Sequence, residues 1–215
     1  VYDNIKKVIS FEIPTSAGEA LTIIFALLLG MALPVTAVQI LWVNLITGIT
    51  LGIALAFEPT ENNTMRRPPR PRDESLLTGG LVWHIILVSL LFLAGVFGVY
   101  AFAIDKGHAP ELARSMAMNT LVVLEIFHLF FIRNIYGTSL TWKAVRGTNV
   151  IWATVGAIIA AQFAVTYLPP LQGIIGTVPI PLFDGLLIVG VGILFFIVIE
   201  IEKQLRLSFV RARGP

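Results

Sequence analysis

The sequence predicts an all-α membrane protein, a bundle of six transmembrane helices with both ends of the chain on the cytoplasmic side. Of its 215 residues, 56% are hydrophobic and 13% are charged, whereas a soluble domain carries about 25% charged residues. The mean hydropathy is +0.86, and long uncharged stretches alternate with short basic segments. This composition excludes an ordinary cytosolic enzyme, a disordered chain and a nucleic-acid-binding protein. The lipid bilayer is therefore an expected partner.

The first two spans are predicted to form a hairpin. A transmembrane helix needs about 20 predominantly apolar residues, and the uncharged stretch 20–57 is too long for one such helix. Pro34, with Gly30 before it, divides this stretch, because proline is poorly tolerated inside a helix. We therefore expect helices over residues 2–33 and 37–57.

The other four spans follow from the same criteria. The uncharged stretch 147–183 is interrupted by YLPPLQGIIGTVPIP, whose prolines disfavour a continuous helix and separate the last two spans. We expect these four helices over residues 81–104, 112–132, 149–168 and 183–202.

The basic residues indicate the orientation of the bundle. All of them except Lys106 and Arg114 lie in segments that six spans place on one side of the membrane. These segments are 1–10, 58–80, 132–149 and the tail after 202. Lys and Arg are enriched in cytoplasmic loops, so we expect cytoplasmic termini and a multi-pass location in the plasma membrane.

Polar side chains inside the predicted spans are the candidate functional residues. A charged group in the bilayer costs on the order of 2.5–3.5 kcal/mol on insertion scales, so its presence suggests a function. Carboxylate, amide and hydroxyl oxygens are the ligands that hard cations prefer, and the chain has no cysteine for soft ones. The sequence therefore predicts an intramembrane site for a cation, for protons or for both in alternation, with the candidate ligands Ser16, Glu19, Asn44, Thr47 and Glu125.

Each of these polar residues also has a structural interpretation. A lone hydroxyl or amide in a membrane helix can bond to its own backbone or join two helices, which applies to Ser16 and Asn44. We expect His128 to face a lipid headgroup or a water molecule, and Gln162 to serve packing. Pro14 is expected to kink the first helix beside the site.

The motifs of the chain resemble those of a known family. VYDNIKKVI, SAGEAL, PVTAVQILWVNLITG, ALAFEP and MRRPPR are similar to the P-type cation-transporting ATPases, in the group of the calcium and sodium/potassium pumps. The similarity begins at the fifth transmembrane helix of that family and runs to its C-terminus. Heavy-metal pumps of the superfamily have only two helices after their catalytic domain, so six helices disfavour that branch.

The resemblance implies a set of cation ligands. The fifth-helix pair falls on Ser16 and Glu19, the sixth-helix set on Asn44, Thr47 and Gly48, and the eighth-helix carboxylate on Glu125. Ser16 stands where an Asn is usual, and Gly48 stands where an Asp is usual. Because glycine supplies no ligand, the resemblance favours a monovalent cation, a proton or a single divalent ion over two calcium ions.

The resemblance also implies that this chain is one part of a pump. Val1 is not methionine, and the phosphorylated-aspartate, nucleotide and actuator regions and the first four helices of the family are absent from the sequence. We therefore expect a fragment without catalytic residues of its own. ATP and Mg²⁺ would bind only in the missing domains, and the transported cation would be Ca²⁺, Na⁺, K⁺ or H⁺. The missing parts of the same pump are the expected partners.

Two other functions remain open at this point. The same intramembrane carboxylates would suit a stand-alone ion channel or a secondary cation transporter. A membrane scaffold without transport activity also remains if both carboxylates are structural.

Overall fold

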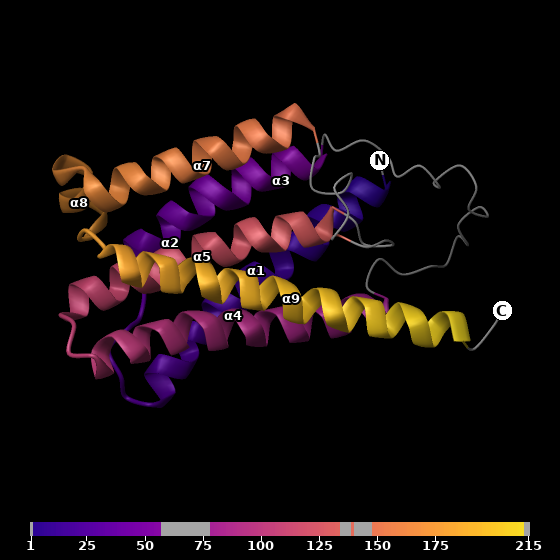
Figure 1. Cartoon of the computed structure of the whole chain (residues 1–215), viewed down its shortest axis with the longest axis horizontal. Coiled ribbons are helices and arrows are strands. Elements are labelled where there is room, and N and C mark those ends of the chain that lie inside the picture. The colour runs from indigo at the N-terminus through magenta and orange to yellow at the C-terminus, as the bar shows by residue number, and fades with distance from the viewer. Residues whose placement is uncertain (1, 57–77, 134–138, 140–147, 213–215) are drawn as a thin grey trace.

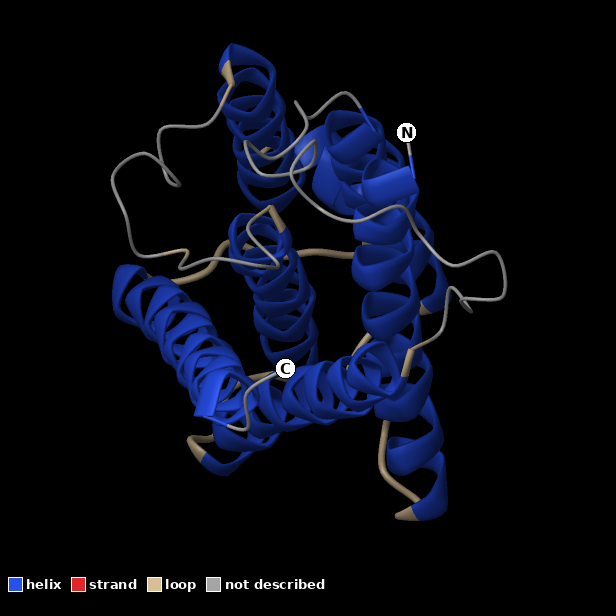
Figure 2. Ribbon diagram, turned by 90° about the vertical axis from the view of Figure 1, so that its right-hand side faces the viewer, coloured by secondary structure: helices blue, strands red, loops and turns tan. Residues whose placement is uncertain are grey.

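The fold is that of a computed structural model, which describes residues 2–56, 78–133, 139 and 148–212 (Figure 1). Six helices in this part of the chain are long and apolar enough to cross a membrane, and Figure 2 shows only helices and connections there. The predicted all-helical, six-span fold class is confirmed. The spans are α1 (Tyr2–Leu28), the consecutive pieces α2 (Ala37–Val43), η1 (Asn44–Gly48) and α3 (Ile49–Ala56), then α4 (Gly79–Asp105), α5 (Pro110–Ile132), α7 (Asn149–Tyr167) and α9 (Leu182–Ala212).

The hairpin between α1 and α2 has defined ends. The helix α1 stops at Leu28, short of the expected residue 33, and Gly30 follows in the left-handed conformation with φ 65°. Glycine is the usual residue at such a helix end, because it has no Cβ to oppose a positive φ. Thr36 then caps α2: its hydroxyl accepts from the Gln39 backbone, and Gln39 Oε1 accepts from the Thr36 N–H.

The second span is not a uniform α-helix, as had been expected for residues 37–57. The segment η1, Asn44–Gly48, is π-helical, and the backbone N–H of Ile49 bonds to the carbonyl of Asn44, five residues earlier. Single π-helical turns inside α-helices occur frequently at functional sites. All three predicted site positions of this span lie within this segment.

The helix α5 is the centre of the bundle. In its most apolar window, 72% of the residues are buried inside the chain, against 28–39% in the other five spans. It packs against α4 and α9, while α1 runs along α4 and α3 packs on α7 (Figure 1). A residue that α5 directs inward is therefore surrounded by protein and not by lipid.

Glycines allow two of these helix pairs to approach closely. A Cβ on Gly18 of α1 would lie 2.5 Å from Phe92 Cβ of α4. A Cβ on Gly192 of α9 would lie 2.5 Å from Val123 Cγ1 and 2.6 Å from a Phe127 ring carbon of α5. Small residues at helix contacts are typical of membrane bundles, where van der Waals packing drives association.

The proline-rich segment after α7 interrupts the apolar stretch, as expected. It contains a short helix, α8 (Pro169–Ile175), which was not predicted from the sequence. Its two prolines occupy the first turn, where a missing N–H breaks no helical hydrogen bond, and Gly176 ends it with φ 72°. The segment still separates the fifth and sixth spans.

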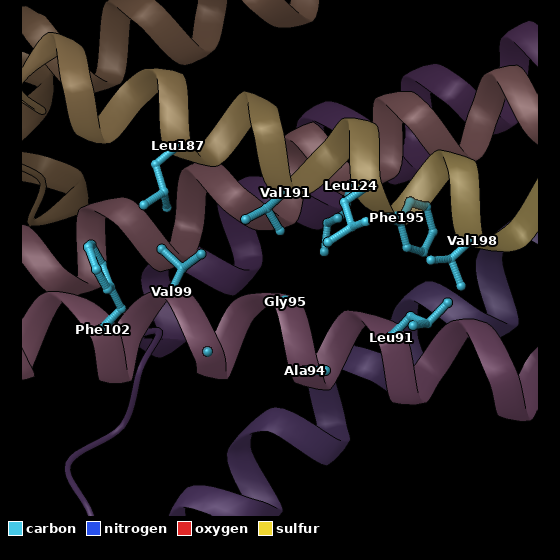
Figure 3. A pocket seen from close by; sticks show the side chains of 12 residues that line it. Leu91, Ala94, Gly95, Val99, Phe102, Leu124, Leu187, Val191, Phe195 and Val198 are labelled. Carbon is cyan, nitrogen blue, oxygen red and sulfur yellow. The ribbon is translucent and has the colours of Figure 1, made fainter.

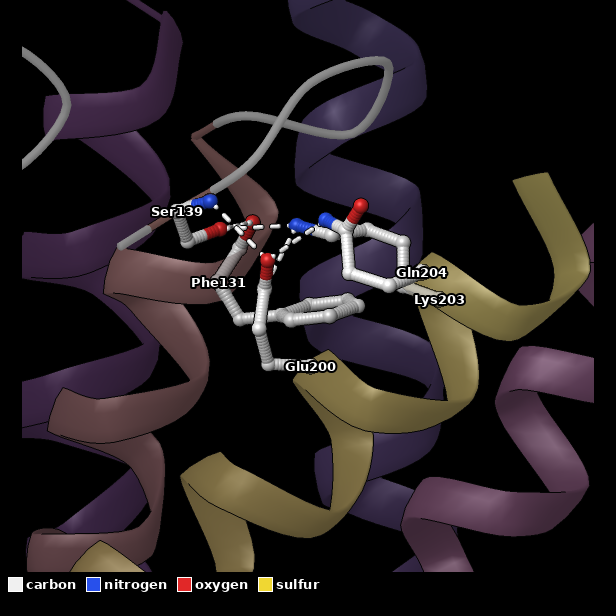
Figure 4. Close-up of polar contacts among 5 residues, drawn as sticks. All are labelled: Phe131, Ser139, Glu200, Lys203 and Gln204. Atoms are coloured by element: carbon white, nitrogen blue, oxygen red, sulfur yellow. Dashed lines mark hydrogen bonds and ion pairs between the residues drawn. The ribbon is translucent and has the colours of Figure 1, made fainter. Parts of the chain in front are cut away.

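The last helix continues ten residues beyond the expected end at 202 and carries a buried ion pair (Figure 4). Lys203 Nζ lies 2.7 Å from Glu200 Oε2 and donates to Ser139 Oγ at 2.7 Å. The Ser139 backbone N–H donates to Glu200 Oε1 at 3.1 Å. These contacts attach Ser139, which follows α5 in the chain, to the end of α9.

A second ion cluster stands at the opposite end of α9. Asp184, in the first turn of α9, accepts from Lys106 Nζ at 3.1 Å, and its Oδ2 lies 3.3 Å from His108 Nε2. It joins the α4–α5 connection to the start of α9. The first residues of α1 and the last residues of α9 lie at the same end of the bundle, where both chain termini are marked (Figures 1 and 2).

Candidate cation site

The structure joins two predicted site residues directly. Asn44 Nδ2 of η1 donates to Glu19 Oε2 of α1 at 2.8 Å and to the Ile40 carbonyl at 3.1 Å. The Glu19 side chain is buried, and its Oε1 has no hydrogen-bond partner among the described residues. One carboxylate oxygen is thus oriented by the amide, while the other remains available to a ligand.

A second pair of predicted residues lies between η1 and α5. Thr47 and Glu125 are both buried, and the Thr47 hydroxyl donates to the Val43 carbonyl at 2.6 Å. The Thr47 side chain also interacts with the Glu125 carboxyl group, which lies within electrostatic range of Glu19. Within the described part of the chain, Glu125 Oε2 has no hydrogen-bond partner.

Ser16 is placed differently from the other four. It precedes Glu19 by three residues on α1, but its side chain is exposed on the surface of the described chain. The structure therefore does not bring Ser16 together with Glu19 and Asn44, and its role as a ligand stays a prediction.

Sequence analysis missed one carboxylate at this site, that of Glu12. A Cβ on Gly48 would lie 3.5 Å from Glu12 Oε2, and a Cβ on Gly52 would lie 3.0 Å from Glu12 Oε1. The signal was present in the sequence, because Glu12 precedes Glu19 by seven residues and so lies on the same face of a helix.

His128 does not face a lipid headgroup, which was one of the two surroundings expected for it. It is fully buried on α5, and its Nε2 lies 3.1 Å from Nε2 of His84 on α4. Its ring also stacks on Phe11 of α1, with 5.4 Å between the centroids. The central position of α5 explains the difference, because this face of the helix is covered by protein.

Two other polar residues in the spans serve packing. Trp42 Nε1 of α2 donates to Gln162 Oε1 of α7 at 3.1 Å. This bond joins two spans inside the apolar region, in agreement with the packing role expected for Gln162. It also gives the deep-lying Trp42 a polar partner.

The carboxylates do not form a closed coordination shell. Among the described residues, no group of three or more His, Asp or Glu side chains converges closely enough to hold a metal ion. The geometry instead places carboxylate, amide and hydroxyl oxygens of α1, η1 and α5 beside one another, with two carboxylate oxygens unpaired. Such oxygens can hold a hard cation once further ligands or a small helix movement complete the shell.

An apolar groove lies away from these residues. It runs between α4 and α9 beside Gly95 and is lined by apolar side chains such as Leu91, Val99 and Phe195 (Figure 3). It offers no oxygen ligand, so it is not a second candidate cation site.

Comparison with known proteins gives a consistent result. The family model described as "Cation transporting ATPase, C-terminus" matches residues 32–205. The chain is 40% identical over 217 residues to the probable cation-transporting ATPase F of Mycobacterium tuberculosis, which covers all of this chain and 23% of that protein.

More distant relatives are named as calcium pumps. The calcium-transporting ATPase of Bacillus subtilis is 36% identical over 194 residues, or 88% of this chain and 21% of that protein. The human calcium-transporting ATPase type 2C member 1 is 27% identical over 208 residues, or 97% of this chain and 22% of that protein. The chain thus spans less than a quarter of the length of these curated relatives.

Proposed function

Because the chain belongs to the cation-transporting ATPase C-terminus family, we propose that it forms the cation-binding and translocation part of an ATP-driven pump. It is a multi-pass part of the membrane domain of a P-type cation-transporting ATPase. The observation that carries the finer proposal is the Glu19–Asn44 bond at a π-helical segment, next to the buried Thr47 and Glu125. The site residues of this proposal are Glu19, Asn44, Thr47 and Glu125, with Ser16 as a further candidate.

The proposed site combines a fixed part with a deformable part. Glu125 stands on the central, most buried helix, while Asn44 and Thr47 stand on a segment whose hydrogen bonds depart from the α-helical pattern. A π-helical turn can return to an α-helical one with a change in the direction of its side chains. Such a change would alter the distance between the η1 oxygens and Glu125, and so the cation affinity.

Coupling to ATP lies outside this chain in our proposal. ATP and Mg²⁺ bind in other domains of the pump, and phosphorylation there moves α1, whose first residues carry Lys6 and Lys7 on the proposed cytoplasmic side. The movement exposes the site alternately to the two sides of the plasma membrane. The cation is the substrate of this cycle.

The test is a Glu19→Gln variant of the full-length pump. Glutamine keeps the size of the side chain and removes its charge, so we expect at least about a tenfold rise in the cation concentration that half-activates ATP hydrolysis. ATP-dependent uptake into membrane vesicles should fall in parallel. Glu111→Gln is the matched control, because Glu111 is an exposed acid in the first turn of α5.

Two results would contradict the proposal. Unchanged cation affinity and turnover in the Glu19→Gln variant would remove Glu19 from the site. Cation uptake that proceeds without ATP hydrolysis would instead favour the channel or secondary-transporter alternative.

A further inference from the structure

Glu12 lies in a gap that two glycines leave open. Gly48 ends η1 and Gly52 lies one turn further in α3, so both face the same side of the span. The Cβ position of residue 48 is 3.5 Å from Glu12 Oε2, and that of residue 52 is 3.0 Å from Oε1. A Cβ at residue 52 would crowd the carboxylate of α1, and one at residue 48 would come into van der Waals contact with it.

Among the described residues, the carboxylate of Glu12 has no structural partner that accounts for its position. Within the described part of the chain, no hydrogen bond or ion pair to its side-chain oxygens is formed. The residue is only partly exposed, and it belongs to a span. A carboxylate in such surroundings needs a counter-charge, and the nearby charged groups that the structure identifies are the acids Glu19 and Glu125.

Unpaired buried oxygens mark the same place independently. Glu125 is 3% exposed and Glu19 is 6% exposed. Among the described residues, Glu125 Oε2 and Glu19 Oε1 each lack a hydrogen-bond partner. Glu125 interacts electrostatically with Glu12 as well as with Glu19. Asn44 Oδ1 lies 3.9 Å from the same Cβ position of residue 48 that Glu12 approaches. Oxygens of α1, η1 and α5 therefore lie in the surroundings of Glu12, although among the described residues the carboxylates do not converge on one point.

We propose that Glu12 is a further ligand of the cation site and supplies from α1 the carboxylate that Gly48 cannot supply from η1. This inference rests on the proposed function. With Glu12 the site has three carboxylates, together with the Asn44 amide and the Thr47 hydroxyl. Three negative charges and neutral oxygen ligands suit a divalent hard cation, because divalent ions of this class are held by several charged oxygens.

The experiment removes the carboxylate at residue 12 of α1 and introduces one at residue 48 of η1, in the full-length pump. The variants are Glu12→Gln, Gly48→Asp and the double variant with both substitutions. CaCl₂ and MnCl₂ are the divalent probes and NaCl is the monovalent one, each titrated against ATP hydrolysis in purified membranes. Thermal unfolding in detergent checks that each variant is folded, and Glu111→Gln is again the matched control.

We expect Glu12→Gln to raise the half-activating divalent concentration at least about tenfold. Gly48→Asp alone should also impair activation, because its carboxylate is placed next to Glu12. The double variant should recover to within about threefold of the wild type, since one carboxylate again occupies the gap. A residue that only supports packing would not give this recovery.

The outcomes separate this inference from the function beneath it. If divalent cations activate ATP hydrolysis normally in Glu12→Gln but poorly in Glu19→Gln, the role of Glu12 is overturned and the proposed pump function still stands. A defect in Glu12→Gln without recovery in the double variant would make Glu12 structural. Activation by NaCl and not by the divalent ions would overturn the cation class, and no cation activation of the wild type would overturn the proposed function.

Discussion

The buried ion pair at the end of α9 leads to a prediction for the variant Lys203→Met. Lys203 is 0% exposed, and its ammonium group contacts Glu200, Ser139 and the ring of Phe131, whose centroid is 4.3 Å away. Methionine fills the space of the lysine stem but leaves the buried Glu200 carboxylate without that ammonium group. Removing one partner of a buried pair costs about 3–5 kcal/mol.

The assay is thermal unfolding of the purified pump in detergent. For a chain of about this size, 1 kcal/mol corresponds to roughly 2–4 °C in the midpoint, so we expect a decrease on the order of 6–20 °C in the transition of the membrane domain. The double variant Glu200→Gln with Lys203→Met should lose less than Lys203→Met alone. It removes the buried charge and keeps an oxygen that can accept from the Ser139 backbone.

A decrease in the double variant as large as in Lys203→Met would refute this reasoning. The loss would then come from packing of the lysine stem and not from an uncompensated carboxylate. A Lys203→Met protein with an unchanged midpoint would show that the pair contributes nothing to stability.

Two further variants test the helix contacts. Gly192→Ala should destabilise the bundle by about 1–3 kcal/mol, because its Cβ would clash with Val123. Gly190→Ala is the matched control, because no atom lies within 4 Å of the Cβ position of residue 190. Equal unfolding midpoints of the two variants would contradict the prediction. Gln39→Ala removes the bond from the Thr36 N–H to Gln39 Oε1, which is one half of the capping box of α2, and the 3.1 Å bond from Gln39 Nε2 to the Gly176 carbonyl, so about 1–3 kcal/mol should be lost in the same thermal assay. A midpoint equal to that of the wild type would mean that the α2–α8 contact does not support the fold.

The fold class was predictable because the bilayer restricts composition so strongly. The spacing of charged residues fixes the number of spans, and Pro34 and the later proline-rich segment mark two of the connections. The helix ends were less predictable. Residues 203–212 look like a charged tail, but the helix continues through Glu202 and Arg206, which are paired at i,i+4 with 3.3 Å between Oε1 and Nε.

The candidate site was predictable as a set of residue types but not as a geometry. The Glu19–Asn44 bond joins residues on the two arms of the predicted hairpin. The rotation of each helix about its own axis depends on its neighbours, so the inward position of His128 and the exposure of Ser16 could not be derived from one helix at a time. Glu12 was missed because the space that Gly48 and Gly52 leave for its carboxylate exists only where α1 packs on the second span.

The π-helical segment makes the length of the second span as important as its composition. Each residue of an α-helix advances the side-chain direction by about 100°. A deletion in an α-helical part of the span would therefore rotate the residues after it by about this angle, whereas the wider π-helical turn Asn44–Gly48 holds one extra residue and can absorb a deletion while Gly52 stays turned toward Glu12. When relatives are aligned, a one-residue gap inside this segment is therefore compatible with the same packing of Ile49–Ala56, and a gap elsewhere in the span is not.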